Sequence, residues 1–124
     1  MGYTNNDSLV LFCIGFGRKG CTLKSIISSS DYLDRSIIER ETLQKSLNVL
    51  LVNGFIDVKN KRYFATDNAI NLYNKEKDKK GIIRACRDFL QELQKENYID
   101  SDREIITISE NEYRKALGIR KFLH

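Results

Sequence analysis

The sequence predicts a mainly α-helical fold with one small β-hairpin, followed by a C-terminal helix–strand–helix extension. The first observation is a stripe of leucines at helical spacing that ends at Gly54. The second is a pair of short apolar runs on either side of the charged tetrad KNKR at 59–62, which is typical of a hairpin. The third is the charge run KEKDKK at 75–80, which divides the chain into a domain of residues 1–75 and an extension of residues 76–124.

Length and composition favour a folded protein. The 124 residues are 41% hydrophobic and 31% charged, which is enough apolar surface to form a core. Lys and Arg total 21 against 17 Asp and Glu, and the net charge of +4 is compatible with a polyanionic partner. The longest apolar run, Leu9–Ile14, is far shorter than the roughly 18 residues of a membrane span, and no basic residue precedes it as in a secretory signal. We therefore expect a cytoplasmic protein with no membrane partner.

Three helices are expected before the hairpin. Residues 7–16 form a continuous apolar run, in which periodicity does not distinguish a buried helix from a buried strand. Thr22 is a suitable N-cap for a second helix, since its hydroxyl can accept a hydrogen bond from a free backbone N–H. The third helix is predicted over residues 39–54, where Asn53 and Gly54 are residue types that tolerate a left-handed C-cap.

Two strands and a fourth helix complete the first domain. Phe55–Val58 and Tyr63–Ala65 are the predicted strands, with Asn60 in the turn between them. Thr66 or Asp67 can cap the helix that follows.

The extension is predicted to contain a helix, a strand and a helix. Gly81–Lys95 has a wide apolar face at helical spacing, and Glu104–Ile108 is rich in Ile, as strands are. Ser109 with Glu112 has the form of a capping box and predicts a last helix that includes Phe122.

The apolar face of the helix over residues 81–95 must be covered, because a stripe of this width in water would promote aggregation. It either packs on the first domain or pairs with its copy in a second subunit, and we favour the homodimer. The residues expected at this contact are Ile82, Cys86, Phe89 and Leu93.

The run LQKSLNVLLVNGFIDVKNKRYFAT, Leu43–Thr66, resembles the signature of prokaryotic winged helix-turn-helix proteins. In that pattern a leucine-rich third helix is followed by Gly, an apolar strand, a basic turn and an aromatic strand ending in Thr. The resemblance extends over residues 22–73. It implies a winged-helix domain whose third helix enters the major groove of double-stranded DNA and whose basic turn, the wing, contacts phosphates.

The resemblance also implies a DNA-binding site in two parts. The expected base-reading side chains on the third helix are Arg40, Gln44, Lys45 and Asn48, and the expected phosphate contacts on the wing are Lys59, Lys61 and Arg62. We therefore expect a small DNA-binding regulator of transcription. The alternative is a winged-helix protein-interaction module that binds no DNA, because the charges on the third helix cancel and Val49 and Val52 are expected on its outward face.

The sequence argues against an enzyme, a metal site and a bound cofactor. The single histidine, His124, is the last residue, and the cysteines at 13, 21 and 86 have no metal-ligand spacing, which favours reduced, buried thiols. GFGRKG at 15–20 matches a dinucleotide-binding motif. However, the segment after it contains no second strand ending in an acidic residue, which such a site requires about 20 positions further on. The glycines are therefore expected to form a turn between two helices.

Overall fold

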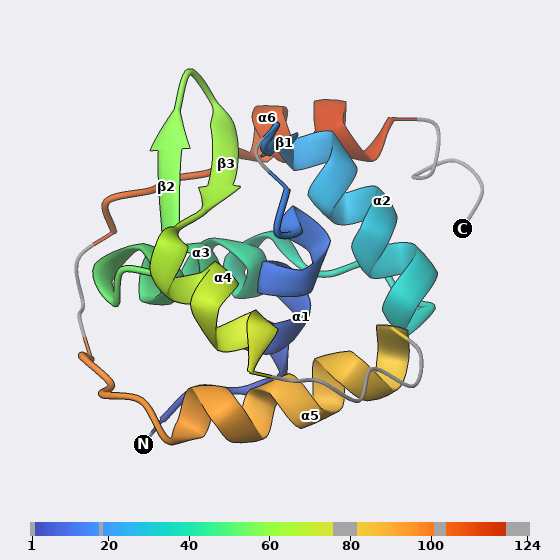
Figure 1. The fold of residues 1–124 in the computed structure, drawn as a ribbon. Helices are drawn as coiled ribbons and strands as arrows, with labels where there is room; N and C mark the ends of the chain where they lie inside the picture. The colour runs from blue at the N-terminus through green and yellow to red at the C-terminus, as the bar shows by residue number, and fades with distance from the viewer. Residues whose placement is uncertain (1, 18, 76–81, 101–103, 119–124) are drawn as a thin grey trace.

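The computed structural model describes residues 2–17, 19–75, 82–100 and 104–118. The fold is mainly helical, with a small three-stranded antiparallel sheet (Figure 1). The elements in chain order are α1 (Asn5–Ile14), β1 (Cys21–Thr22), α2 (Leu23–Asp34), α3 (Arg40–Val52), β2 (Ile56–Lys59), β3 (Arg62–Ala65), α4 (Asp67–Asn74), α5 (Ile82–Gln94) and α6 (Glu110–Leu117).

Helix α1 lies at the centre of the fold and packs against α2, α3 and α5. The continuous apolar run is therefore a helix enclosed on several sides, which explains why its sequence has no single apolar face. A capping box fixes its start: the Thr4 hydroxyl accepts from the Asp7 amide, and the Asp7 carboxylate accepts from the Thr4 amide at 2.8 Å. Val10 and Leu11 are completely buried.

The leucine stripe of α3 faces this core as predicted. Leu43, Leu47 and Leu50 are each 0% exposed, and Ile56 of β2 is 1% exposed. The predicted caps of α2 and α4 are also confirmed: the Thr22 hydroxyl accepts from the Ser25 amide, and the Thr66 hydroxyl accepts from the Ala69 amide. The second and third helices with the hairpin thus fold as the sequence predicts.

The sheet contains one strand that the sequence did not predict. The strand order is β1-β3-β2, with Cys21 opposite Tyr63, so the two-residue β1 extends the hairpin by one strand. A side-chain Cβ at Gly20, where φ is +68°, would collide with the Phe64 ring and would lie 2.8 Å from the Tyr63 carbonyl oxygen. Gly20 is therefore required so that the loop after α1 can approach β3.

Helix α5 covers α1 within the same chain, and this corrects the expected dimer contact. Phe89 and Leu93 are each 0% exposed, so neither is accessible to a second subunit. Phe89 packs edge-on against Phe12 and Phe16, with ring centroids 5.4 and 5.7 Å away. Cys86 is half-buried, and the side chain of Ile82 lies outside the described residues. In the part of α5 whose side chains are described, the apolar face is covered by packing within the chain, at Ala85, Phe89 and Leu93, the other option that the sequence left open.

The predicted strand over residues 104–108 is wrong. These residues are a loop with a bend at Ile106, and no described strand pairs with them. The last helix does begin after Ser109, whose hydroxyl accepts from the Glu112 amide at 3.1 Å, and the predicted position of Phe122 lies outside the described residues. Within the described part of the chain, no helix has the length and apolar character needed to cross a membrane.

Candidate nucleic-acid interface

The outward face of α3 is occupied by residues 104–109, which we call the strap. Asn48 makes two hydrogen bonds to one strap residue. Its Nδ2 donates to the Ile106 carbonyl at 2.8 Å, and its Oδ1 accepts from the Ile106 amide at 2.7 Å. Asn48 is only 6% exposed. The side chain expected to read a base edge therefore binds the main chain of this protein.

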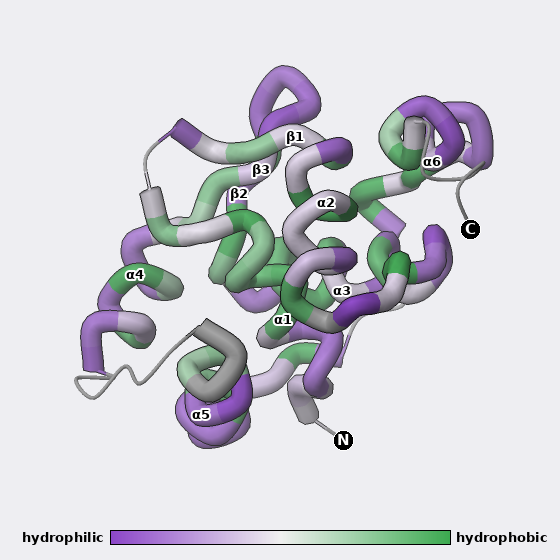
Figure 2. The backbone as a smooth tube through the Cα atoms, turned by 90° about the vertical axis from the view of Figure 1, so that its right-hand side faces the viewer, coloured by the Kyte–Doolittle hydropathy of each residue, from purple (hydrophilic) through white to green (hydrophobic). Residues whose placement is uncertain are grey.

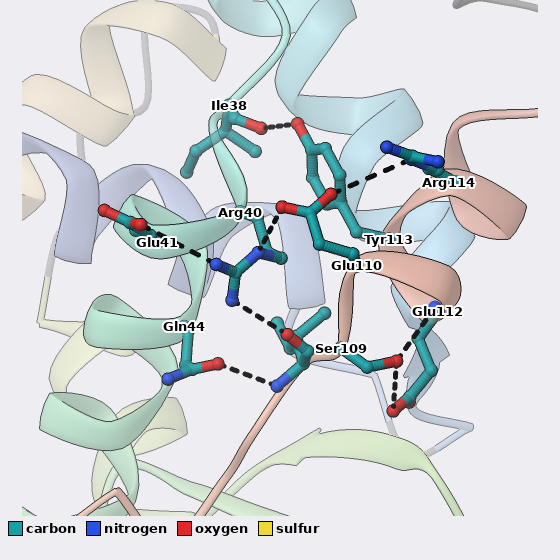
Figure 3. Close-up of polar contacts among 10 residues, drawn as sticks. Ile38, Arg40, Glu41, Gln44, Ser109, Glu110, Glu112, Tyr113 and Arg114 are labelled. Atoms are coloured by element: carbon teal, nitrogen blue, oxygen red, sulfur yellow. Dashed lines mark hydrogen bonds and ion pairs between the residues drawn. The ribbon is translucent and has the colours of Figure 1, made fainter.

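Two further α3 side chains hold the strap and the start of α6 in the same way (Figure 3). The Gln44 Oε1 accepts from the Ile108 amide at 2.7 Å. Arg40 donates through Nη1 to the Ile108 carbonyl at 3.0 Å and through Nε to the Glu110 carboxylate at 3.2 Å. Arg40, Gln44 and Asn48 are four residues apart and share one helix face, so their partners follow one another along the strap.

The contact continues to the C-terminal end of α3. Asn53 donates to the Ile99 carbonyl at 3.1 Å and accepts from the Ile99 amide at 2.7 Å. The partners of residues 53, 48, 44 and 40 are residues 99, 106, 108 and 110, so the C-terminal segment runs antiparallel to α3. Polar side chains of α3 and its C-cap thus bond to the described parts of the C-terminal segment at four positions along the helix.

The strap is also held by apolar side chains. Ile106 and Ile108 are 8% and 2% exposed, whereas Ile105 between them is 59% exposed. The Tyr113 hydroxyl of α6 donates to the Ile38 carbonyl just before α3. Burial raises the pKa of Tyr113, and the carboxylates of Glu39 and Glu110 raise it further. The strap and α6 together, residues 104–117, form what we call the cover.

The remaining residues predicted on α3 are placed differently. Lys45 is exposed, as expected. Val49 is buried at 9% exposure and Val52 is half-buried, so the expectation that both lie on an open outward face is wrong for Val49. The C-terminal segment that crosses this side of α3, through its bonds to Asn48 and Asn53, was not predicted.

The hairpin tip retains the predicted exposed cations and projects away from the body (Figures 1 and 2). Asn60 and Lys61 form the turn with φ of 52° and 60°, and Lys59 and Lys61 are exposed. Arg62 points back toward the loop before β1, where its Nη2 donates to the carbonyls of Lys19 and Gly20, each at 3.3 Å. Arg62 therefore has a structural role beside any contact with a ligand.

A cleft of about 430 Å³ lies between the hairpin, the start of α2 and α6. Its lining residues include four cations, Lys24, Lys61, Arg62 and Lys115, and one acid, Glu112. We call it the cationic cleft. The N-terminus of α2 also lines it through Thr22 and Leu23 and contributes the positive end of the helix dipole.

Two of these cations, Lys24 and Lys115, were missed by the sequence reasoning. Lys24 lies in the first turn of a helix whose N-cap was predicted, which was an available signal. Lys115 lies 53 positions from Arg62 in sequence, and nothing local indicates that α6 lies beside the hairpin.

The positive charge of the cationic cleft suits it to binding anions. The cleft offers no nucleophile at neighbouring Cys21, because burial raises the pKa of that thiol from 9.0 to about 11 although Arg62 lowers it.

No model of a known protein family, no curated protein and no solved structure matches the chain. Among the described residues, no group of three or more His, Cys, Asp and Glu side chains gathers in a way that could hold a metal ion.

Proposed function

We propose that the protein is a winged-helix regulator that binds the phosphate backbone of double-stranded DNA through the cationic cleft and the hairpin tip. The order of three helices followed by a hairpin, with α3 ending at Val52 shortly before Gly54, supports the winged-helix part of this proposal. The hairpin is then the wing.

The observation that carries the proposal is the charge of the cleft. Four cations and the N-terminus of α2 meet around one carboxylate, beside the exposed Lys59 of the projecting hairpin. A polyanion that spans the cleft and the tip would neutralise several of these charges at once and release condensed counterions, which is the main source of sequence-independent DNA affinity.

The contribution of α3 differs from that of an open reading helix. In this arrangement Arg40, Gln44 and Asn48 are bonded to the cover, so they supply no base contacts. DNA binding by the covered protein should therefore depend on phosphates and depend little on sequence.

A salt titration with a mixed-sequence duplex tests the proposal. Lys24→Ala, Lys61→Ala and Lys115→Ala should each weaken binding on every sequence and reduce the slope of log Kd against log salt by about one unit. The matched control is Lys95→Ala, just after the end of α5, whose side chain pairs with Glu92 and does not line the cationic cleft. Helix α5 lies on the side of the molecule away from the hairpin (Figure 1). Wild-type protein that binds no duplex at low salt, or cleft variants that bind like Lys95→Ala, would refute the proposal.

A protein-interaction module is the second candidate, and one observation favours it. The polar face of α3 binds the main chain of an extended segment through both N–H and C=O groups, and this is how a peptide from another protein would be held. Absence of DNA binding at low salt, together with capture of an extended peptide that has the strap's sequence, would favour this function over the first.

A further inference from the structure

We propose that the cover, residues 104–117, is an autoinhibitory element that occupies the base-reading face of α3 and whose release converts sequence-independent DNA binding into base reading. This inference rests on the proposed function and concerns regulation of the same interface.

The first argument is the chemistry of the contacts. An adenine presents an acceptor and a donor side by side in the major groove, and Asn binds both at once. The main chain of Ile106 presents the same pair to Asn48, a carbonyl acceptor at 2.8 Å and an amide donor at 2.7 Å. The strap thus pairs both the donor and the acceptor of the Asn48 side chain, as the edge of an adenine would.

Arg40 gives a second match. A guanine offers two neighbouring acceptors, which Arg binds with two donors. Here the two acceptors are the Ile108 carbonyl and the Glu110 carboxylate, which receive Nη1 and Nε of Arg40. The same side-chain atoms cannot serve the cover and a base at the same time, so binding of the cover and base reading exclude each other.

The third argument concerns how the strap is attached. Its main-chain bonds go to side chains of α3 and to no strand of the sheet, so its release leaves every helix and strand of residues 5–74 with its own backbone bonds. Only Ile106 and Ile108 anchor the strap in the core, while Glu104, Ile105 and Thr107 are exposed. The rest of the cover is held by the packing of α6 on α2, where Ala116 and Leu117 are buried, so opening of the whole cover breaks these contacts too and takes Lys115 out of the cationic cleft. These contacts are not backbone bonds of residues 5–74, so the cover can open while the domain beneath it stays folded.

The experiment compares Ile106→Asp combined with Ile108→Asp, which should release the cover, with Ile105→Asp combined with Thr107→Asp. The second pair adds the same charge to the same segment at exposed positions. Each protein is used to select binders from duplexes with a randomised centre. We expect the wild type and the control to enrich no motif and the released variant to enrich one. Asn48→Ala in the released background should reduce discrimination at one base position by about 5- to 150-fold.

Native-state hydrogen exchange of the wild type tests whether the strap opens before the protein unfolds, and it does so even if the released variant fails to fold. The Ile106 and Ile108 amides donate to Asn48 and Gln44, so their exchange reports opening of the strap. We expect them to exchange at least tenfold faster than the amides of Leu47 and Leu50 in α3. Exchange of all four amides at one common rate, that of global unfolding, would overturn the inference.

The outcomes separate the two proposals. Failure of the wild type to bind mixed duplex DNA at low salt refutes the proposed function. If the wild type binds DNA and the released variant folds but enriches no motif, the autoinhibitory role of the cover is refuted. The proposed binding to the phosphate backbone of DNA is then still supported.

Discussion

Replacing Asn48 with Ala should lower the free energy of unfolding by about 2–5 kcal/mol. The substitution removes two hydrogen bonds to Ile106, which together contribute about 1–3 kcal/mol. Ile106 is 8% exposed, and we expect the strap to shift so that one of its two main-chain groups reaches water while the other stays buried without a partner, which costs roughly a further 1–3 kcal/mol. Because Ala has a better helix propensity than Asn, the substitution also raises the free energy of unfolding by about 0.5 kcal/mol, which offsets part of the loss.

Urea denaturation followed by circular dichroism measures this loss. Lys45→Ala is the matched control, because it lies on the same helix, is exposed and forms none of the bonds to the strap, so its effect should stay within about 0.5 kcal/mol. If Asn48 instead faced solvent, Asn48→Ala would be neutral or slightly stabilising. A change in unfolding free energy no larger than that of Lys45→Ala would therefore contradict the placement of the strap on α3.

The remaining predictions concern the core and the pH dependence of stability. Leu47→Ala, at a fully buried position, should cost about 2–5 kcal/mol in the same denaturation assay, and a cost below 1 kcal/mol would contradict its burial. Phe89→Asp should unfold the protein rather than yield a folded monomer, because the carboxylate would be buried among aromatic rings; circular dichroism and light scattering distinguish the two results. The pKa of Cys21 rises from 9.0 to about 11 on folding, so the folded state holds the thiol proton more tightly than the unfolded state. The resulting stability is fully present below pH 9 and is lost as pH rises toward 11. Cys21→Ser should reduce this loss in denaturation curves recorded across that range, and identical pH profiles would count against the shift.

Local signals in the sequence predicted most of the elements. Thr22, Thr66 and Ser109 each cap the helix that they were expected to cap, because capping depends only on residues within one turn. The leucine stripe of α3 and the hairpin were predicted for the same reason. The two-residue β1 was missed because so short a strand has no periodicity, and its pairing with Tyr63 depends on chain folding.

Partners distant in sequence were the part that could not be predicted. The amphipathic pattern of α5 shows that one face is covered, but it is the same for a face packed on α1 as for one packed on a second subunit. Residues 104–108 do alternate as a strand does, with Ile106 and Ile108 inside and Ile105 outside. Their backbone partners are side chains of α3 rather than a neighbouring strand.

The bonds between the candidate site and the strap could not be predicted for a related reason. Arg40, Gln44 and Asn48 form a polar stripe at a spacing of four, and such a stripe can bind base edges or the donors and acceptors of a main chain. Only the folded chain distinguishes these two uses. In the structure the partner of this stripe is the strap, and base contact by the same residues stays a prediction.

The contacts of the strap also determine the order in which the molecule assembles. Asn48 and Ile106 are 58 positions apart, so their bonds close a long loop and carry a larger entropic cost than the contacts within residues 5–74. We expect the helices and hairpin to form first and the strap to close afterwards. A newly synthesised chain would then have an uncovered α3 until residue 108 had left the ribosome. The strap's stabilising effect should accordingly appear in the rate of unfolding: Asn48→Ala should accelerate unfolding and leave the folding rate almost unchanged in a stopped-flow chevron.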